Sequence, residues 1–171
     1  MASERTIVVA VEDTATAGVV GAAAAHVAME EDAGAIVLLH VVENHIVAQG
    51  LMSIALPVPM RETQSEAQSV LAETEAALRA EYAALDRPMP TITQRLVGGT
   101  AIGAVLCEVA NEVGAAKIVV GGRRPHAFGR FAHADVRAAL RHHTQIPVHV
   151  APLQAAETQT AGDNAGDTSH A

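Results

Sequence analysis

Short apolar runs alternate along this chain with longer segments of helical periodicity. The apolar runs are rich in valine, isoleucine and leucine, which is typical of strands buried in a parallel sheet. Together with one segment of alternating apolar and polar residues, the expected strands are 6–11, 35–42, 91–97, 118–120 and 146–150. Alanine content and apolar residues spaced three and four apart predict helices between them. The expected helices are 14–33, ended by Gly34; 61–86; 102–113, ended by Gly114; and one starting near Ala134.

Strands that alternate with helices predict an α/β domain with a parallel sheet and right-handed crossovers. Five such strands commonly stack in the order 3-2-1-4-5, and ligands then bind in the crevice between strands 1 and 4. In this chain that arrangement brings Glu12 and Asp13, after the first strand, next to Gly121 and Gly122, after the fourth. The turns after these two strands are therefore the candidate site. Adjacent carboxylates at a strand end most often cap the following helix, so we expect no catalytic role for Glu12 and Asp13.

Composition narrows the class of protein. The 171 residues are half apolar but only 2% aromatic, so the core must consist of small and aliphatic side chains. We expect one domain at 1–152 and, because 153–171 is mostly small and polar, a disordered C-terminal tail. The net charge of −8 and a single lysine argue against nucleic-acid binding. With no membrane-length apolar run, a cytoplasmic protein that is not inserted in a membrane is expected.

The segment 43–60 is mostly apolar without clean periodicity and contains two prolines. Long connections of this kind are uncommon in compact domains. One interpretation is that the segment folds back over the sheet edge or the crevice. The other is that it forms a dimer surface or a docking surface for a protein or transporter partner.

Four segments in this order resemble the universal stress protein family, and together they cover nearly all of 5–152. They are IVVAVEDTATA, IVLLHVVE, VGGTAIGAVLCEVANEVGAAKIVVGG and HADVRAALRHHTQIPVHVAP. The resemblance implies a three-layer α/β sandwich around a five-stranded parallel sheet, of the adenine nucleotide alpha hydrolase-like type. It also implies homodimers, often joined by antiparallel pairing of the last strands. Here the interface residues would be Ile146, Pro147, Val148, His149 and Val150.

The ATP-binding branch of that family carries a G-x2-G-x9-G-S/T motif after the fourth strand. Gly121 matches the first glycine, whereas Arg124, Ala134 and Asp135 depart from the other three positions, and Glu12 replaces the opening aspartate. The candidate residues of a nucleotide site are Ala10, Val11, Glu12, Val41, Gly98, Gly121, Gly122, Arg123, Arg124, Arg130, Ala134, Asp135 and Val136.

Two interpretations of this altered loop stay open. Arg124 would occupy space that a glycine leaves for phosphate, and Asp135 would cap a helix whose positive end an anion needs. A carboxylate about 4 Å from a phosphate charge costs on the order of 4 kcal/mol at an effective dielectric constant near 20. Alternatively, Arg123, Arg124 and Arg130 hold the phosphate themselves, because guanidinium groups bind it bidentately. The leading prediction is a non-catalytic stress-response regulator with a degenerate pocket; the alternative is an ATP, AMP or cyclic AMP sensor.

The sequence lacks the motifs of hydrolases, nucleotide-cleaving enzymes and metal sites. No serine has the G-x-S-x-G spacing of a hydrolase, and the Walker A lysine is absent, so we expect no enzyme. The chain has nine histidines but no pair spaced four apart, and its one cysteine, Cys107, has no cysteine partner, so no metal site is expected. His40 lies within an apolar strand and is expected to be a hydrogen-bonded core residue.

Overall fold

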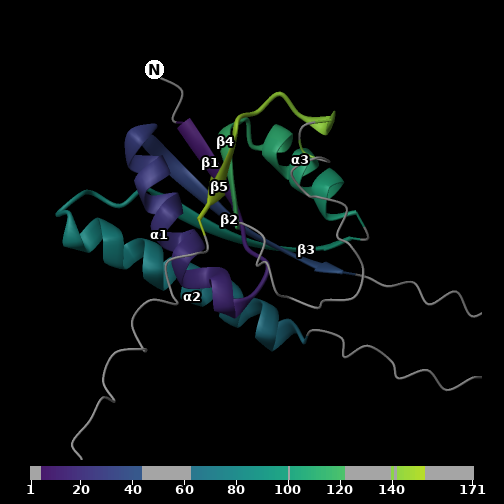
Figure 1. Cartoon of the computed structure of the whole chain (residues 1–171), viewed down its shortest axis with the longest axis horizontal. Helices are drawn as coiled ribbons and strands as arrows, with labels where there is room; N and C mark the ends of the chain where they lie inside the picture. The colour runs from purple at the N-terminus through teal and green to yellow at the C-terminus, as the bar shows by residue number, and fades with distance from the viewer. Residues whose placement is uncertain (1–4, 44–62, 100, 122–139, 141, 153–171) are drawn as a thin grey trace, which may run out of the picture.

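A computed structural model describes residues 5–43, 63–99, 101–121, 140 and 142–152 (Figure 1). Five parallel strands form one sheet in the order β3-β2-β1-β4-β5, which confirms the predicted fold class and strand order. The strands are β1 (Arg5–Ala10), β2 (Ala33–Glu43), β3 (Thr91–Gly99), β4 (Ala115–Gly121) and β5 (Val148–Ala151).

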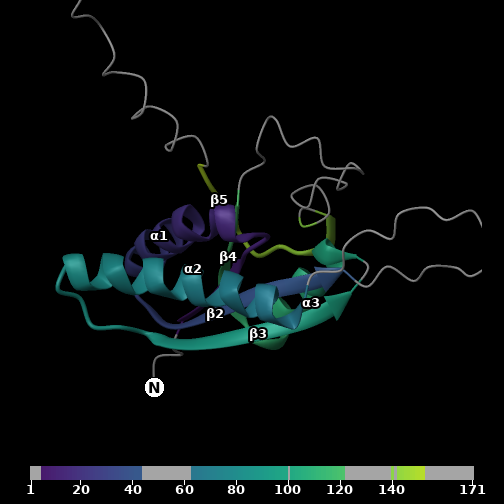
Figure 2. The same ribbon diagram turned by 90° about the horizontal axis from the view of Figure 1, so that it is seen from below.

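Helices cover both faces of the sheet, giving three layers. The helices are α1 (Thr14–Glu30), α2 (Gln64–Ala84) and α3 (Ile102–Glu112); Leu140, His142 and His143 are also helical. Figure 1 shows the strands between α3 on one side and α1 with α2 on the other. Figure 2 shows that α2 lies alongside α1. The predicted tail at 153–171 and nearly all of 43–60 lie outside the described residues.

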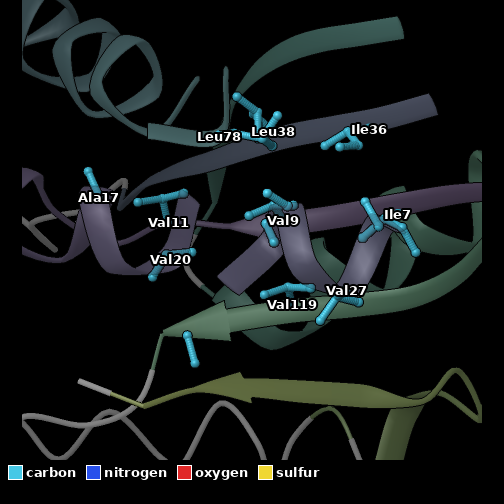
Figure 3. Packing of buried hydrophobic residues seen from close by; sticks show 14 of the residues in the cluster. Ile7, Val9, Val11, Ala17, Val20, Val27, Ile36, Leu38, Leu78 and Val119 are labelled. Carbon is cyan, nitrogen blue, oxygen red and sulfur yellow. The ribbon is translucent and has the colours of Figure 1, made fainter. Parts of the chain in front are cut away.

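The central strands β2, β1 and β4 bury side chains on both faces, which explains their continuous apolar sequences. Ile7 and Val9 of β1 point to the α1 side, where they pack near Val20 and Val27 (Figure 3). Val8 points to the opposite side and packs in a second cluster with Leu106 of α3. A strand that is buried on both faces shows no alternation in its sequence.

The helix ends differ from the sequence-based expectation. α1 ends at Glu30 rather than Ala33, and Gly34 lies inside β2 rather than ending the helix. The reversal is made by Asp32, which has a φ of 52°, and Asp86 does the same after α2 with a φ of 48°. Glycine is the usual residue for this left-handed conformation, but aspartate also adopts it. Only after α3 does the expected glycine, Gly114, make the turn, with a φ of 60°.

The ends of β3 and β5 and the start of α2 also differ from those that the sequence predicts. β3 continues through Gly98 and Gly99, beyond the predicted strand 91–97. β5 runs from Val148 to Ala151, so Ile146 and Pro147 precede the strand instead of belonging to it. At the start of α2, Thr63 forms a capping box with Glu66, so the helix begins later than the predicted 61–86.

Candidate functional site

The carboxyl ends of the strands meet at one edge of the sheet, where parallel α/β folds bind their ligands. β1 lies between β2 and β4, with Ala10 paired to Leu39 on one side and Val120 on the other. The turn after β1 and the end of β4 at Gly121 are therefore neighbours, as the sequence predicted. Val41 of β2 pairs with Val97 of β3, one strand farther along the same edge.

Main-chain hydrogen bonds and one buried histidine hold the chain just after β1. Val11 is 5% exposed, and its N–H donates to the carbonyl of Leu39 at 3.1 Å. Its own carbonyl lies 2.8 Å from Nδ1 of His40, which is 2% exposed. This confirms that His40 is a hydrogen-bonded core residue, and it fixes the direction in which the next residue, the exposed Glu12, leaves the sheet.

Asp13 occupies the N-terminus of α1. Its carboxylate accepts hydrogen bonds from the backbone N–H of Thr16 at 2.8 Å and from the Thr16 hydroxyl at 2.9 Å. An N-cap aspartate satisfies helix N–H groups and places a negative charge at the positive end of the helix dipole. The predicted capping role of this acidic pair is confirmed for Asp13, and the chain itself supplies the anion at this end.

The N-terminus of α3 differs from that of α1. Its N-cap residue is Ala101, and no side chain caps it among the described residues. Close by, a Cβ at Gly99 would lie 2.6 Å from the Val105 side chain, so a glycine there lets β3 pass close to the first turn of α3. This helix end lies at the same sheet edge and keeps its positive partial charge.

The glycines that the sequence assigned to the site have different surroundings. A Cβ at Gly121 would lie 3.3 Å from Val20 of α1, so the end of β4 packs closely under that helix. Gly98 is exposed on β3. The remaining predicted residues, which include all three arginines, lie outside the described residues: Gly122, Arg123, Arg124, Arg130, Ala134, Asp135 and Val136.

Several of the ion pairs lie away from this edge. At the opposite edge Glu31 binds both Lys117 and Arg5, and the hydrogen bond from Lys117 lowers the pKa of Glu31 below its usual value. On the α3 face Arg95 of β3 makes two hydrogen bonds to Glu112, at 3.0 and 3.1 Å, which lower the pKa of that carboxyl. These charges stabilise local structure and do not face the candidate site.

A hollow of about 620 Å³ lies at the amino edge of the sheet, far from the predicted site. It is lined by Asn111, Ala115, His142, His143, Thr144, Gln145, Ile146 and Pro147. The hollow is open and its two histidines are exposed, whereas a ligand site normally encloses its ligand. We therefore keep the candidate site at the carboxyl edge.

Within the described part of the chain, no three histidine, cysteine or acidic side chains are grouped as metal ligands. Cys107 is 5% exposed in α3, and burial raises the pKa of its thiol. None of the described helices has the length and hydropathy of a bilayer-spanning segment.

Sequence reasoning found the carboxyl edge but missed Thr16. The signal was present, because an aspartate three residues before a threonine at a helix start is a capping pattern. The partner of His40 was also missed, since the Val11 carbonyl lies 29 positions earlier in the chain. Pairs so distant in sequence become visible only once the strand order is known.

The model of the universal stress protein family matches residues 4–152. No curated protein matches the chain. Among solved structures, the universal stress protein from Archaeoglobus fulgidus is 21% identical, with a TM-score of 0.57 and coverage of 86% of this chain and 98% of that one. A universal stress protein in complex with cAMP is 20% identical, with a TM-score of 0.56 and coverage of 87% and 97%.

A third structure, universal stress protein UspA from Lactobacillus plantarum, is 18% identical, with a TM-score of 0.53 and coverage of 89% of this chain and 100% of that one. At these identities the structures establish a shared fold. The family model covers most of the chain and includes all five described strands. This chain therefore belongs to the universal stress protein family.

Proposed function

We propose that this universal stress protein is a non-catalytic, cytoplasmic regulator that acts as a homodimer and through contacts with a partner, and that its nucleotide pocket is degenerate. The observation that carries the proposal is the Asp13 carboxylate, which already occupies the N-terminus of α1 at the carboxyl edge. A phosphate drawn to the same N–H groups would meet this charge. At about 4 Å the repulsion is on the order of 4 kcal/mol at an effective dielectric constant near 20.

Isothermal titration with ATP, AMP and cyclic AMP tests the pocket. We expect no heat of binding at millimolar nucleotide for the unmodified protein. Asp13→Ser keeps a capping oxygen and removes the charge, so any latent affinity for phosphate should increase in this variant. Asp86→Asn is the matched control, since it removes one exposed negative charge in a turn outside the site and keeps a residue that tolerates the left-handed conformation. Nucleotide binding by the unmodified protein would overturn the degenerate pocket.

The dimer is proposed at β5. Among the described residues β5 pairs with β4 alone, so one edge of a short apolar strand is left without a partner. Exposed strand edges tend to pair with another chain, and a twofold dimer closes such an edge by pairing it with its own copy. Sedimentation velocity at micromolar protein should give a dimer, and a monomer throughout that range would contradict this part of the proposal.

Absence of catalysis has its own test. We expect no phosphate release from ATP over prolonged incubation. Release that Glu12→Gln abolishes would show that the exposed carboxylate after β1 acts as a base and would overturn the assignment.

The partner surface is proposed at 43–60, and the segment after Glu43 lies outside the described residues.

A second candidate is an adenine-nucleotide sensor that uses Arg123, Arg124 and Arg130 to hold phosphate. Two observations favour it. The N-terminus of α3 at the carboxyl edge has no described side-chain cap, and one solved universal stress protein with this fold is in complex with cAMP. The same titration decides between the two candidates: binding that is lost in Arg124→Gly would support the sensor, because a glycine restores the family's motif but removes the proposed clamp.

A further inference from the structure

The direction of the main-chain groups along β5 follows from one hydrogen bond. Ile118 pairs with Val148, and the N–H of Ile118 donates to the carbonyl of Pro147 at 2.9 Å. Since main-chain groups of successive strand residues point to alternate sides, the N–H and C=O of His149 also point to β4. Those of Val148 and Val150 therefore point outward, and these two residues supply the hydrogen-bonding groups of the outer edge.

A second copy can pair with this edge in one favourable register. An antiparallel twofold pair must place its axis at Val148, His149 or Val150. An axis at Val148 needs the N–H of Ile146, which already donates to the hydroxyl of the threonine two positions before it at 3.0 Å. An axis at Val150 needs an N–H from Pro152, which has none. With the axis at His149, both outward residues pair with each other across the interface and every group is used.

We propose that the twofold axis of the dimer passes between the two copies of His149, and that protonation of these histidines weakens the dimer. The inference rests on the β5 dimer proposed above. In this register the two histidines lie directly opposite each other and make no main-chain hydrogen bonds to each other. The Cα atoms of such a pair are about 4.5 Å apart. Directly opposed side chains project from the same face of the sheet, and like charges at such positions are destabilising.

The face on which this pair lies is set by its neighbours. Ala151 belongs to the core cluster under α1, whereas Val148 and Val150 pack against the cluster under α3. His149 alternates with the two valines and therefore shares the α1 face with Ala151. It is half-buried in the single chain, so a second copy would bring the two imidazoles together in a partly desolvated place.

The charged groups around this face offer little compensation for two added positive charges. On β4 the titratable residue is Lys117, whose ammonium is bound to Glu31 at the end of α1. On α1 itself, His26 lies 3.5 Å from Glu81 of α2, and Glu30 is exposed in the last turn. Of these acidic groups, Glu31 is bound to Lys117, Glu81 lies beside His26, and Glu30 is exposed to solvent. A cation at the axis is disfavoured by the same lysine, which is why we infer repulsion rather than metal binding.

The expected effect can be estimated from the separation of the charges. Two imidazolium charges about 6 Å apart repel enough to raise the dissociation constant about threefold at the dielectric constant of water and about hundredfold at an effective value near 20. Histidine is the side chain that gains its charge in the mildly acidic range, so the dimer affinity should be compared at about pH 7.5 and about pH 5.5.

Sedimentation velocity at these two pH values tests the proposal. The unmodified dimer should dissociate more readily at the lower pH. His149→Gln should form a dimer whose affinity hardly changes with pH, while His143→Gln, which removes an exposed histidine outside the interface, should keep the full dependence. Equal pH dependence in the unmodified protein and in His149→Gln would overturn the proposal but leave the dimer intact. A monomer at both pH values would overturn the dimer and this inference together.

Disulfide formation tests the register directly. His149→Cys should cross-link rapidly under mild oxidation, because the expected Cα separation lies within the range of disulfides. Val148→Cys should not, because the two copies of residue 148 would be offset by two residues along each strand and lie beyond that range. The native Cys107 is buried and should not compete. A dimer in which Val148→Cys cross-links and His149→Cys does not would refute the axis at His149.

Discussion

Two glycines in α1 provide a matched test of how tightly the helices on one face are packed. At Gly21 an added Cβ would lie 2.5 Å from the carbonyl oxygen of Thr74 and 2.9 Å from Cβ of Ala77, both in α2. At Gly18, three residues earlier, nothing lies within 4 Å of the added atom. Replacing each by alanine makes the same chemical change in the same helix, in one case against a neighbour and in the other in open space.

The magnitudes follow from two opposing effects. Alanine is favoured over glycine by about 1 kcal/mol in a helix interior. Overpacking typically costs about 1–3 kcal/mol, and more where the obstacle is backbone rather than a flexible side chain. We expect Gly18→Ala to raise the free energy of unfolding by about 0.5–1 kcal/mol. For Gly21→Ala the clash with the Thr74 carbonyl should outweigh the helix propensity, giving a loss of about 1–2 kcal/mol.

Urea unfolding followed by circular dichroism at the helix band measures both variants. The two midpoint urea concentrations should move in opposite directions, with no change in how steeply the free energy of unfolding depends on urea concentration. Thermal unfolding should agree, at about 2–4 °C for each kcal/mol in a domain of this size. If Gly21→Ala is as stable as the unmodified protein, then α2 does not pack against α1 as closely as the structure indicates.

Three further predictions concern single interactions. His40→Leu removes the hydrogen-bond donor of the buried Val11 carbonyl and should lower the free energy of unfolding in urea by about 1–3 kcal/mol. His40→Asn retains a donor near the position of Nδ1 and should lose less stability. Equal losses in the two variants would refute this account. The hydrogen bond from Gln94 lowers the pKa of Glu75. This hydrogen bond therefore stabilises the fold fully above the unfolded carboxyl's pKa of about 4.3, and the stabilisation is lost as the pH falls through the lower folded value. In Gln94→Leu the urea midpoint should fall less steeply at acidic pH, and an unchanged acid dependence would contradict the assignment. Because burial raises the pKa of Cys107, a disulfide reagent should modify this thiol slowly in the folded protein and rapidly in urea, and fast modification of the folded protein would disprove its burial.

The strand order was predictable from the sequence, whereas the helix ends were not. Alternation of apolar runs with helical segments allows few topologies, so the central position of β1 followed from general rules of connection. The end of α1 depended on which residue adopts a positive φ. The sequence offered Gly34, and the chain uses Asp32. Both residue types tolerate that conformation, and the choice is made by where β2 must begin to align Ala33 with Arg5 of β1.

The candidate site, too, was predictable from the sequence only in part. The neighbouring positions of the turn after β1 and the end of β4 followed from topology alone. What the carboxylates do there required coordinates, which show that Asp13 caps α1 through Thr16. The buried Val11 orients the chain before the turn, because its N–H donates to the Leu39 carbonyl and its own carbonyl is hydrogen-bonded to the His40 ring. Sequence spacing carries no information about that orientation.

The two outer strands of the sheet carry different side chains, and this difference favours β5 as the interface of the proposed dimer. β3 carries polar side chains that are held by the neighbouring helices: Arg95 binds Glu112 of α3, and Gln94 donates to Glu75 of α2 at 2.7 Å. Charged and tethered side chains on an edge strand discourage pairing with another chain. The described part of β5 carries no acidic, lysine or arginine side chain, and His149 is its one ionisable residue. We infer that acidification supplies at β5 the charge that β3 carries permanently.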